Sequence, residues 1–175
     1  MEYIGSDAVE KMNKIKKIVL LSLVILTGIG VYLSIGFTYI IGKSMESTMT
    51  NGEILCIDKL YNFEEINRGD IAILDIDYKG KETRVIKRII GIGGDLIKIE
   101  DNKLYINNIL ISEPYLKEVM RGRNQEFEVP EGKIFIMGDN RNISLDSRSN
   151  DVGYIDFNKS IYGKVIFSVS KWKMV

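Results

Sequence analysis

The chain has 175 residues, no histidine and one cysteine, and its 24 lysines and arginines balance its 24 aspartates and glutamates. Without histidine, neither a Ser-His-Asp triad nor a histidine-ligated metal site can form, and a single cysteine allows no internal disulfide and no cysteine-cluster zinc site. The balanced charge gives no basic surplus for nucleic-acid binding. We therefore expect no metal, no cofactor and no nucleic-acid partner, and any catalysis must use serine, threonine, tyrosine, lysine or carboxylates.

The first predicted element is a membrane anchor. No charged residue occurs between Ile18 and Gly42, a stretch longer than the roughly 20 apolar residues that a helix needs to cross a bilayer. A cleavable signal peptide is the alternative, but its apolar region runs only about 7–15 residues and ends in a small-residue cleavage site. No Ala-x-Ala site follows here, because the only alanines are Ala8 and Ala72. The pattern favours an uncleaved anchor.

The charges beside the apolar run predict the topology. Four lysines crowd the polar segment that precedes it, namely Lys11, Lys14, Lys16 and Lys17. Positive charges next to a membrane span stay on the cytoplasmic side. The expected organisation is therefore a cytoplasmic tail at 1–17, a transmembrane anchor at 18–41 and an extracytoplasmic domain at 42–175, with the lipid bilayer as a partner.

Past the anchor, short apolar runs alternate with polar breaks, which is typical of β-strands. The runs cover 54–60, 70–76, 83–92, 96–100, 104–111, 133–137 and 164–170. Asn107-Asn108 predicts a tight hairpin turn, since asparagine tolerates positive φ, and Gly93-Gly94 predicts a sharp reversal. Cys56 is expected to be a buried strand residue rather than a nucleophile. The predicted fold class is mainly β, with one N-terminal transmembrane helix followed by a compact β-rich extracytoplasmic domain.

A serine and a lysine form a candidate reacting pair. Ser44 follows the apolar run closely, but a serine hydroxyl is a poor nucleophile unless a base takes its proton. With no histidine, a neutral lysine amine is the natural substitute, and burial must lower its free pKa of about 10.4 before it is neutral near pH 7. Lys87 lies inside the apolar run 85–90, which favours burial. The alternative is that Lys87 and Arg88 are two charges on a half-exposed strand.

A dense polar loop at 138–148 is the third predicted part of a site. Two acids and two bases follow in close succession: Asp139, Arg141, Asp146 and Arg148. These charges can brace the loop internally, and short side chains such as Ser144 can hydrogen-bond to the backbone. A loop that must hold a hydroxyl beside a buried amine needs such bracing, whereas a simple surface turn does not. A solvated charged loop is the alternative.

Together these segments resemble the bacterial type I signal peptidases, the membrane-anchored Ser/Lys proteases that remove signal peptides from exported proteins. The family's blocks occur in order, as Gly42-Lys43-Ser44-Met45, Arg68-Gly69-Asp70-Ile71, Lys87-Arg88-Ile89-Ile90-Gly91 with Gly94-Asp95, and Gly138-Asp139-Asn140-Arg141 through Arg148. The resemblance covers the chain from Ile18 to Val165, and the last block is its most specific part.

The resemblance implies a role for each matching residue. Ser44 matches the nucleophile, Lys87 the general base, and Ser144 the serine whose hydroxyl orients that lysine. The charges that brace the site match at Asp139, Arg141, Asp146 and Arg148. Proximity and resemblance together make three apolar residues walls of the substrate pocket, namely Met45, Val85 and Ile86.

The chain departs from the family pattern at four positions. Family members use the nucleophile's own backbone N–H as an oxyanion donor, and some add a hydroxyl two residues earlier, where this chain has Gly42. Members usually carry proline at the positions of Ser47 and Gly93, and often at Ile155. Proline fixes φ near about −65°, so its loss loosens turns without removing a reacting group. These departures are compatible with a lower or narrower activity.

The sequence therefore predicts a monomeric serine endopeptidase that removes signal peptides from exported preproteins at the outer face of the cytoplasmic membrane. A self-cleaving repressor of the Ser/Lys class is one alternative, but no DNA-binding domain and no Ala-Gly bond occur here. A weak or inactive homologue that serves as an assembly or chaperone partner for one surface protein is the other. The missing prolines favour that alternative, while the retention of Ser44, Lys87 and Ser144 argues against it.

Overall fold

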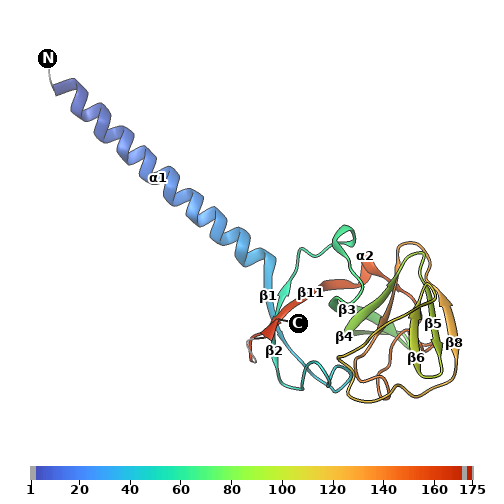
Figure 1. Ribbon diagram of the computed structural model, residues 1–175. Helices are drawn as coiled ribbons and strands as arrows, with labels where there is room; N and C mark the ends of the chain where they lie inside the picture. The colour runs from blue at the N-terminus through green and yellow to red at the C-terminus, as the bar shows by residue number, and fades with distance from the viewer. Residues whose placement is uncertain (1–2, 171–172, 175) are drawn as a thin grey trace. The chain divides into compact units, whose positions relative to one another are not determined.

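The computed structural model describes residues 3–170 and 173–174, and the chain forms two compact units, Met1–Gly36 and Phe37–Val175. The first unit consists mainly of one long helix, α1 (Tyr3–Ser34), drawn in blue in Figure 1. No acidic residue caps its first turn and no basic residue its last. Charges at its ends therefore do not stabilise this helix, and its stability must come from its surroundings.

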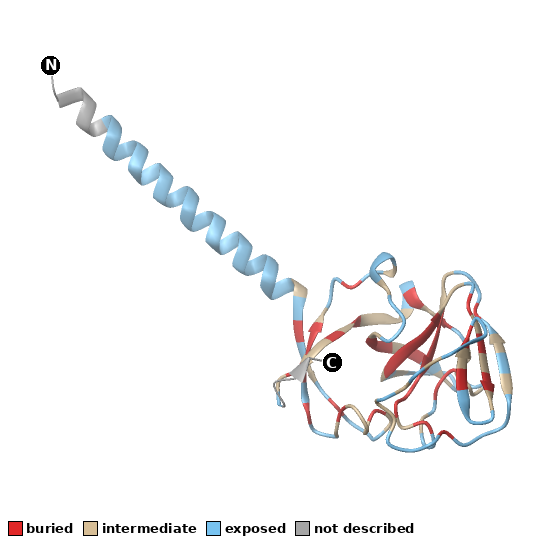
Figure 2. Ribbon diagram, in the orientation of Figure 1, coloured by how far each residue is buried: buried red, intermediate tan, exposed pale blue. Residues whose placement is uncertain are grey.

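Helix α1 presents its apolar side chains outward. Every residue from Ala8 to Leu33 is exposed, and Figure 2 shows this part of the helix in continuous pale blue. The segment Ala8–Ser34 contains an 18-residue window with a mean hydropathy of 2.0, and it is long and apolar enough to cross a membrane. Exposed apolar side chains along a whole helix are what lipid contact requires. The transmembrane role of this helix stays a prediction.

The apolar run and the helix end at different residues. The run continues to Ile41, where we expected the anchor to end, but α1 ends at Ser34 and the next residues form strand β1 (Ile35–Tyr39). Apart from one glycine, β1 contains only β-branched and aromatic residues, which favour the extended conformation. The helical part of the apolar run is therefore shorter than the run itself.

The second unit is built from two sheets. The larger has eight strands in the order β1-β2-β11-β3-β4-β9-β10, with β12 paired to β11, and the smaller has the order β7-β6-β5-β8. The further strands are β2 (Ile54–Asp58), β3 (Ile71–Tyr78), β4 (Lys81–Ile92), β5 (Leu96–Glu100), β6 (Lys103–Ile106), β7 (Ile109–Leu110), β8 (Gln125–Glu128), β9 (Lys133–Met137), β10 (Ile155–Asp156), β11 (Ile161–Ser168) and β12 (Lys173–Met174). Two short helices, η1 (Phe63–Glu65) and α2 (Phe157–Ser160), complete the described part of this unit. The prediction of a mainly β fold after an N-terminal helix is confirmed.

The predicted strands and turns agree closely with the structure. Each of the seven predicted runs contains a strand, and those at 96–100 and 133–137 have the predicted bounds. Asn107 and Asn108 form the turn between β6 and β7 with φ of 52° and 66°, and Gly94 turns the chain between β4 and β5 with φ of 85°. Strands β1, β8, β10 and β12 were not predicted.

Strand β4 pairs with β3 along one edge and with β9 along the other, and the two pairings cover different parts of its length. From Lys81 to Arg88 it pairs with β3, and from Arg88 to Ile92 it pairs with β9, antiparallel in both cases. Before Arg88, the described strands therefore cover only one edge of β4. The other edge keeps backbone groups available for an added strand. Lys87 is the last residue of this open edge.

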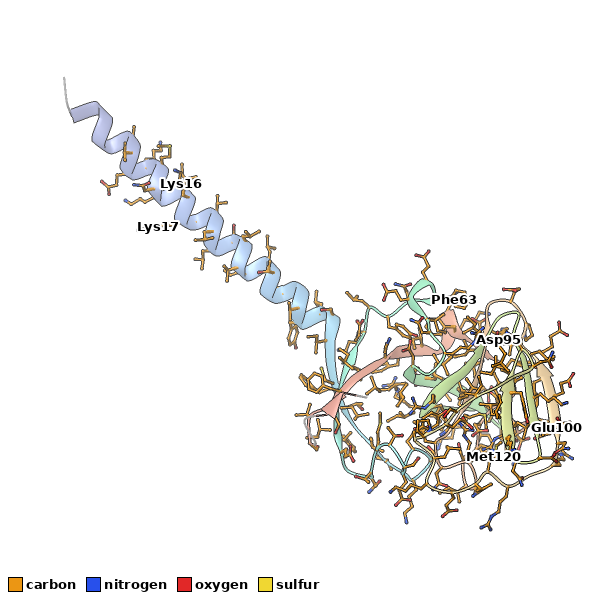
Figure 3. All side chains as sticks on the ribbon, in the orientation of Figure 1. Lys16, Lys17, Phe63, Asp95, Glu100 and Met120 are labelled. Atoms are coloured by element: carbon orange, nitrogen blue, oxygen red, sulfur yellow. The ribbon has the colours of Figure 1, made fainter. Side chains whose placement is uncertain are left out.

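The core of the second unit consists of three apolar clusters. One surrounds Phe157 between β3, β4 and β9, and a second joins β9 to the smaller sheet and includes Met120, labelled in Figure 3. The third lies under the loop that follows β1 and includes Met45 and Met49. Figure 2 shows these buried residues in red, concentrated on the central strands. Cys56 is also buried, as predicted.

Candidate active site

Ser44 lies on a loop between β1 and β2 that buried side chains hold in place. Met45 and Met49 are only 2% and 1% exposed and fix the loop to the core. Gly42 has φ of 111°, which favours glycine, and its N–H donates to Asn51 Oδ1 at 2.9 Å. On the other side, the Ser44 carbonyl accepts a hydrogen bond of 2.8 Å from the N–H of Asn140. Ser44 is therefore fixed on both sides by backbone contacts and packing.

Lys87 reaches Ser44 from the open edge of β4. Its Nζ lies 2.7 Å from Ser44 Oγ and 3.2 Å from the carbonyl oxygen of Ile86. Lys87 is only 4% exposed, and it forms no ion pair with any residue in 3–170 or 173–174. Its hydrogen-bond partners are thus both uncharged. The prediction that Ser44 and Lys87 come together in space agrees with this geometry.

Burial changes the protonation of Lys87. Loss of hydration disfavours the ammonium and lowers the pKa of Lys87 to about 8, although the carboxylates of Asp146 and Asp139 act in the opposite direction. An amine with this pKa is neutral in about a tenth of the molecules at pH 7 and in about half of them at pH 8. It can therefore accept a proton from the Ser44 hydroxyl. This is the chemistry that general-base catalysis requires.

The next residue along β4 has the opposite environment. Arg88 is 8% exposed, and its guanidinium binds the Asp139 carboxylate with two hydrogen bonds of 2.8 and 2.6 Å. It also donates to the Gly69 carbonyl at 2.7 Å and stacks over the Tyr115 ring. Lys87 and Arg88 are therefore not two charges on a half-exposed strand. Both are buried, because β4 is covered on both faces at this point.

The charges of the polar loop make ion pairs inside and outside it. Asp146 pairs with Arg148 within the loop, and Asp146 Oδ2 also accepts from the N–H of Gly138 at 2.9 Å. Arg141, by contrast, makes a bidentate contact of 3.0 and 2.6 Å with Glu113, outside the loop. Asp139 likewise pairs with a residue outside the loop, Arg88. Two of the four charges predicted to brace the loop internally therefore bind residues of other segments. The four charged side chains of this loop are buried or half-buried, so the loop is not merely a solvated one, although Asn142, Ile143 and Leu145 are exposed.

Ser144 lies close to Ser44 but makes no hydrogen bond to Lys87. A Cβ added at Gly138 would come within 2.6 Å of both the Ser144 side chain and the Ser44 carbonyl oxygen. The backbone of Gly138 therefore lies between the two serines, and only glycine fits there. The Ser144 hydroxyl is buried and has no hydrogen-bond partner among the residues that the structure describes. Its role in orienting the lysine stays a prediction.

A cleft of about 380 Å³ begins at Ser44 and Lys87. One wall is the backbone segment 38–42, and the other is the open edge of β4 at 84–87. The three residues predicted to form a substrate pocket all line it, namely Met45, Val85 and Ile86. Over residues 3–170 and 173–174 no group of three or more Cys, Asp or Glu side chains is placed to hold a metal ion.

Sequence reasoning missed several residues that support the site. Glu113 and Tyr115 contact Arg141 and Arg88, and Thr48 donates to the Asp139 carboxylate. These contacts join segments far apart in the chain, so no local pattern marks them. Arg88 was the one residue whose sequence position indicated such support, because a second buried cation next to Lys87 needs an acidic partner.

These features define a class of protein. A serine hydroxyl in hydrogen-bond contact with a buried, unpaired lysine, at the head of a cleft with an open strand edge, has the groups that a Ser/Lys hydrolase needs. The family model of "Signal peptidase, peptidase S26" matches residues 12–172.

Individual relatives agree with the family model. The chain is 43% identical over 126 residues to Signal peptidase I of Bacillus licheniformis, covering 66% of each protein. It is 37% identical over 153 residues to Signal peptidase I U of Bacillus subtilis (strain 168), covering 80% of this chain and 81% of that protein. A crystal structure of a signal peptidase I from Enterococcus faecalis V583 is 32% identical, with a TM-score of 0.47, and covers 59% of this chain and 98% of that one. By the family model and the two Bacillus relatives, this chain belongs to the signal peptidase family and is an S26 serine peptidase.

Proposed function

We propose that this chain removes signal peptides from exported preproteins, with Ser44 as nucleophile and Lys87 as general base. The single observation that carries the proposal is the 2.7 Å contact between Ser44 Oγ and the Nζ of a lysine that is buried with no counterion among the described residues. A structural lysine at this depth needs an acid partner, as Arg88 has in Asp139. A catalytic lysine must lack one, because a carboxylate would keep its amine protonated.

The reaction follows from this pair. Ser44 Oγ attacks the scissile carbonyl while Lys87 Nζ takes the hydroxyl proton, and the ammonium then passes that proton to the departing amine. The acyl group stays on Ser44 until a water molecule, deprotonated by the same lysine, hydrolyses the ester. The developing oxyanion is held by the backbone N–H of Ser44. Gly42 adds no hydroxyl, and its own N–H is engaged by Asn51.

The substrate lies extended along the open edge of β4. The backbone groups of 84–87 on this edge can pair with a peptide, which adds a strand to the sheet. The residues before the cut then occupy the cleft of about 380 Å³. Apolar walls at Met45, Val85 and Ile86, close to Ser44, favour small uncharged side chains beside the scissile bond.

Purified full-length protein in detergent micelles tests the activity directly. Incubated with a preprotein, it should release the mature chain at one junction, identified by mass spectrometry of the product. The Ser44→Ala variant should leave the precursor intact. Failure to cut any member of a preprotein panel, with a folded protein, would favour the inactive assembly partner instead.

We further propose that α1 anchors the chain with its N-terminus in the cytoplasm and places the β-rich domain at the outer membrane face. The exposed apolar residues from Ile18 onward and the lysines that precede them support this orientation; two of these lysines, Lys16 and Lys17, are labelled in Figure 3. Protease added to intact spheroplasts should remove the domain at 42–175. Full protection of that domain would reverse the topology.

A further inference from the structure

A second pocket adjoins the loop that carries Ser44, and no residue of the substrate cleft lines it. This polar pocket has a volume of about 180 Å³, enough for one or two side chains. It is lined by Glu46 and Ser47, by Lys117 and Glu118, and by residues 139–141 of the polar loop. The mechanism proposed above uses none of its solvent-facing charges.

The loop that carries the nucleophile contributes residues to both the cleft and the polar pocket. On this loop the cleft is lined by residues 38–42, Ser44 and Met45, and the polar pocket begins at Glu46. Asn140, in the wall of the polar pocket, donates its N–H to the Ser44 carbonyl at 2.8 Å. The buried Met45 separates the two, since its Sδ accepts from the N–H of Asp139 at 3.4 Å. A peptide cut at Ser44 with its first half in the cleft therefore continues toward the polar pocket.

The charge of the polar pocket is negative. Asp139 and Arg141 are neutralised by partners outside it, Arg88 and Glu113. Among the residues that the structure describes, the carboxylates of Glu46 and Glu118 form no ion pair, and the remaining cation is Lys117. Two uncompensated acids against one base leave a net charge that attracts a basic side chain.

Ser47 gives the polar pocket an unused hydrogen-bonding group. Its hydroxyl is buried and has no partner among the described residues. Buried polar atoms of this kind are rare in native proteins. This observation is independent of the charges, and it also points to a bound polar ligand.

Resting on the proposed function, we propose that the polar pocket binds the first residues of the mature chain, immediately after the scissile bond, and selects for a basic side chain there. Glu46 and Glu118 attract that side chain, and Ser47 hydrogen-bonds to the peptide backbone. Lys117 limits the selection by repelling it. The cleft thus recognises the residues before the cut, and the polar pocket recognises those after it.

The test uses the full-length protein in detergent micelles and a set of quenched fluorescent peptides. All peptides are identical before the cut and carry Lys, Ala or Glu at one of the first three positions after it. At one of these positions, wild type should have a kcat/KM about fivefold higher for Lys than for Glu, the size expected of exposed charge contacts. Added salt should shrink this ratio, because exposed charges are screened.

Variants assign the preference to the polar pocket. Either single change, Glu46→Gln or Glu118→Gln, should equalise the three peptides because the remaining acid balances Lys117, Glu118→Lys should reverse their order, and Lys117→Gln should widen the ratio. Ser47→Ala should lower kcat/KM for all three peptides alike, by about threefold. Glu128→Gln removes an exposed carboxylate on β8, outside the pocket, and should leave the ratio unchanged. A reversed order cannot arise from misfolding.

Two outcomes would overturn the inference, and they are distinguishable. Cleavage that depends on Ser44 but proceeds equally with Lys, Ala and Glu at all three positions would remove the polar pocket's role and leave the proposed function standing. The absence of any cleavage that depends on Ser44 would remove both. A ratio that persists in Glu118→Lys would place the selection elsewhere in the molecule.

Discussion

Lys87 and Arg88 are neighbours on β4, both are buried cations, and their surroundings are opposite. Arg88 has a bidentate carboxylate from Asp139, a backbone carbonyl and an aromatic ring. Among the residues that the structure describes, Lys87 has only the hydroxyl of Ser44 and one carbonyl oxygen as hydrogen-bond partners. Successive residues of a strand point to opposite faces, so one strand can supply two such different environments side by side.

The comparison shows how one strand can place a structural cation and a candidate general base at adjacent positions. A paired guanidinium stays charged and fixes the loop that carries Asp139. An unpaired amine cannot stay fully charged at the same depth, so its pKa falls to about 8 and it becomes a base. Stability and reactivity are thus assigned to adjacent residues by the presence or absence of one carboxylate. The following predictions alter one side of this comparison at a time.

The largest effect is expected from removing the reacting pair. Ser44→Ala and Lys87→Ala should each lower kcat by at least about 10⁴-fold, and the double variant should be little worse, because the two groups act as a unit. Lys87→Arg should be equally inactive, since a guanidinium does not lose its proton in this pH range. Preprotein cleavage measures the loss, and circular dichroism should show an unchanged fold. Normal turnover by Ser44→Ala would remove the nucleophile from the account.

The next effect should appear in stability rather than in chemistry. Asp139→Asn leaves Arg88 buried without its counterion and should lower the free energy of unfolding by about 3–5 kcal/mol. Asp75→Asn is the matched control, because it breaks the more exposed pair with Arg84 and should cost less than about 1 kcal/mol. Chemical denaturation of both variants measures the difference. Equal losses would mean that burial does not distinguish the two pairs.

The smallest effect is predicted for Ser144. Ser144→Ala should lower kcat/KM by up to about tenfold, the contribution of one neutral hydrogen bond formed during the reaction. Its effect on unfolding should be slight, because the hydroxyl has no partner among the described residues to lose. Kinetics and denaturation of the same sample separate the two. A large stability loss with unchanged kinetics would make Ser144 a purely structural residue.

Much of this arrangement could be predicted from local sequence. Alternating apolar residues and paired asparagines encode strands and turns within a few residues, and an apolar run around Lys87 already implies its burial. Other features depend on distant partners. The pairing of Arg141 with Glu113 joins separate segments, and the polar strand Gln125–Glu128 is a strand because it pairs with β5. The end of α1 at Ser34 was also missed, since apolarity alone does not distinguish helix from strand.

The central claim is that Lys87 acts as a neutral base, and the pH dependence of kcat/KM tests it most directly. The ammonium cannot accept the Ser44 proton and the amine can, so activity must increase as pH rises through the pKa of Lys87. The chain contains no histidine whose titration could produce such an increase in activity. Measured on one preprotein between about pH 6 and 10, kcat/KM should rise about tenfold per pH unit below a pKa of about 8 and level off above it. A flat profile, or a rise centred near the unperturbed lysine pKa of about 10.4, would contradict the account.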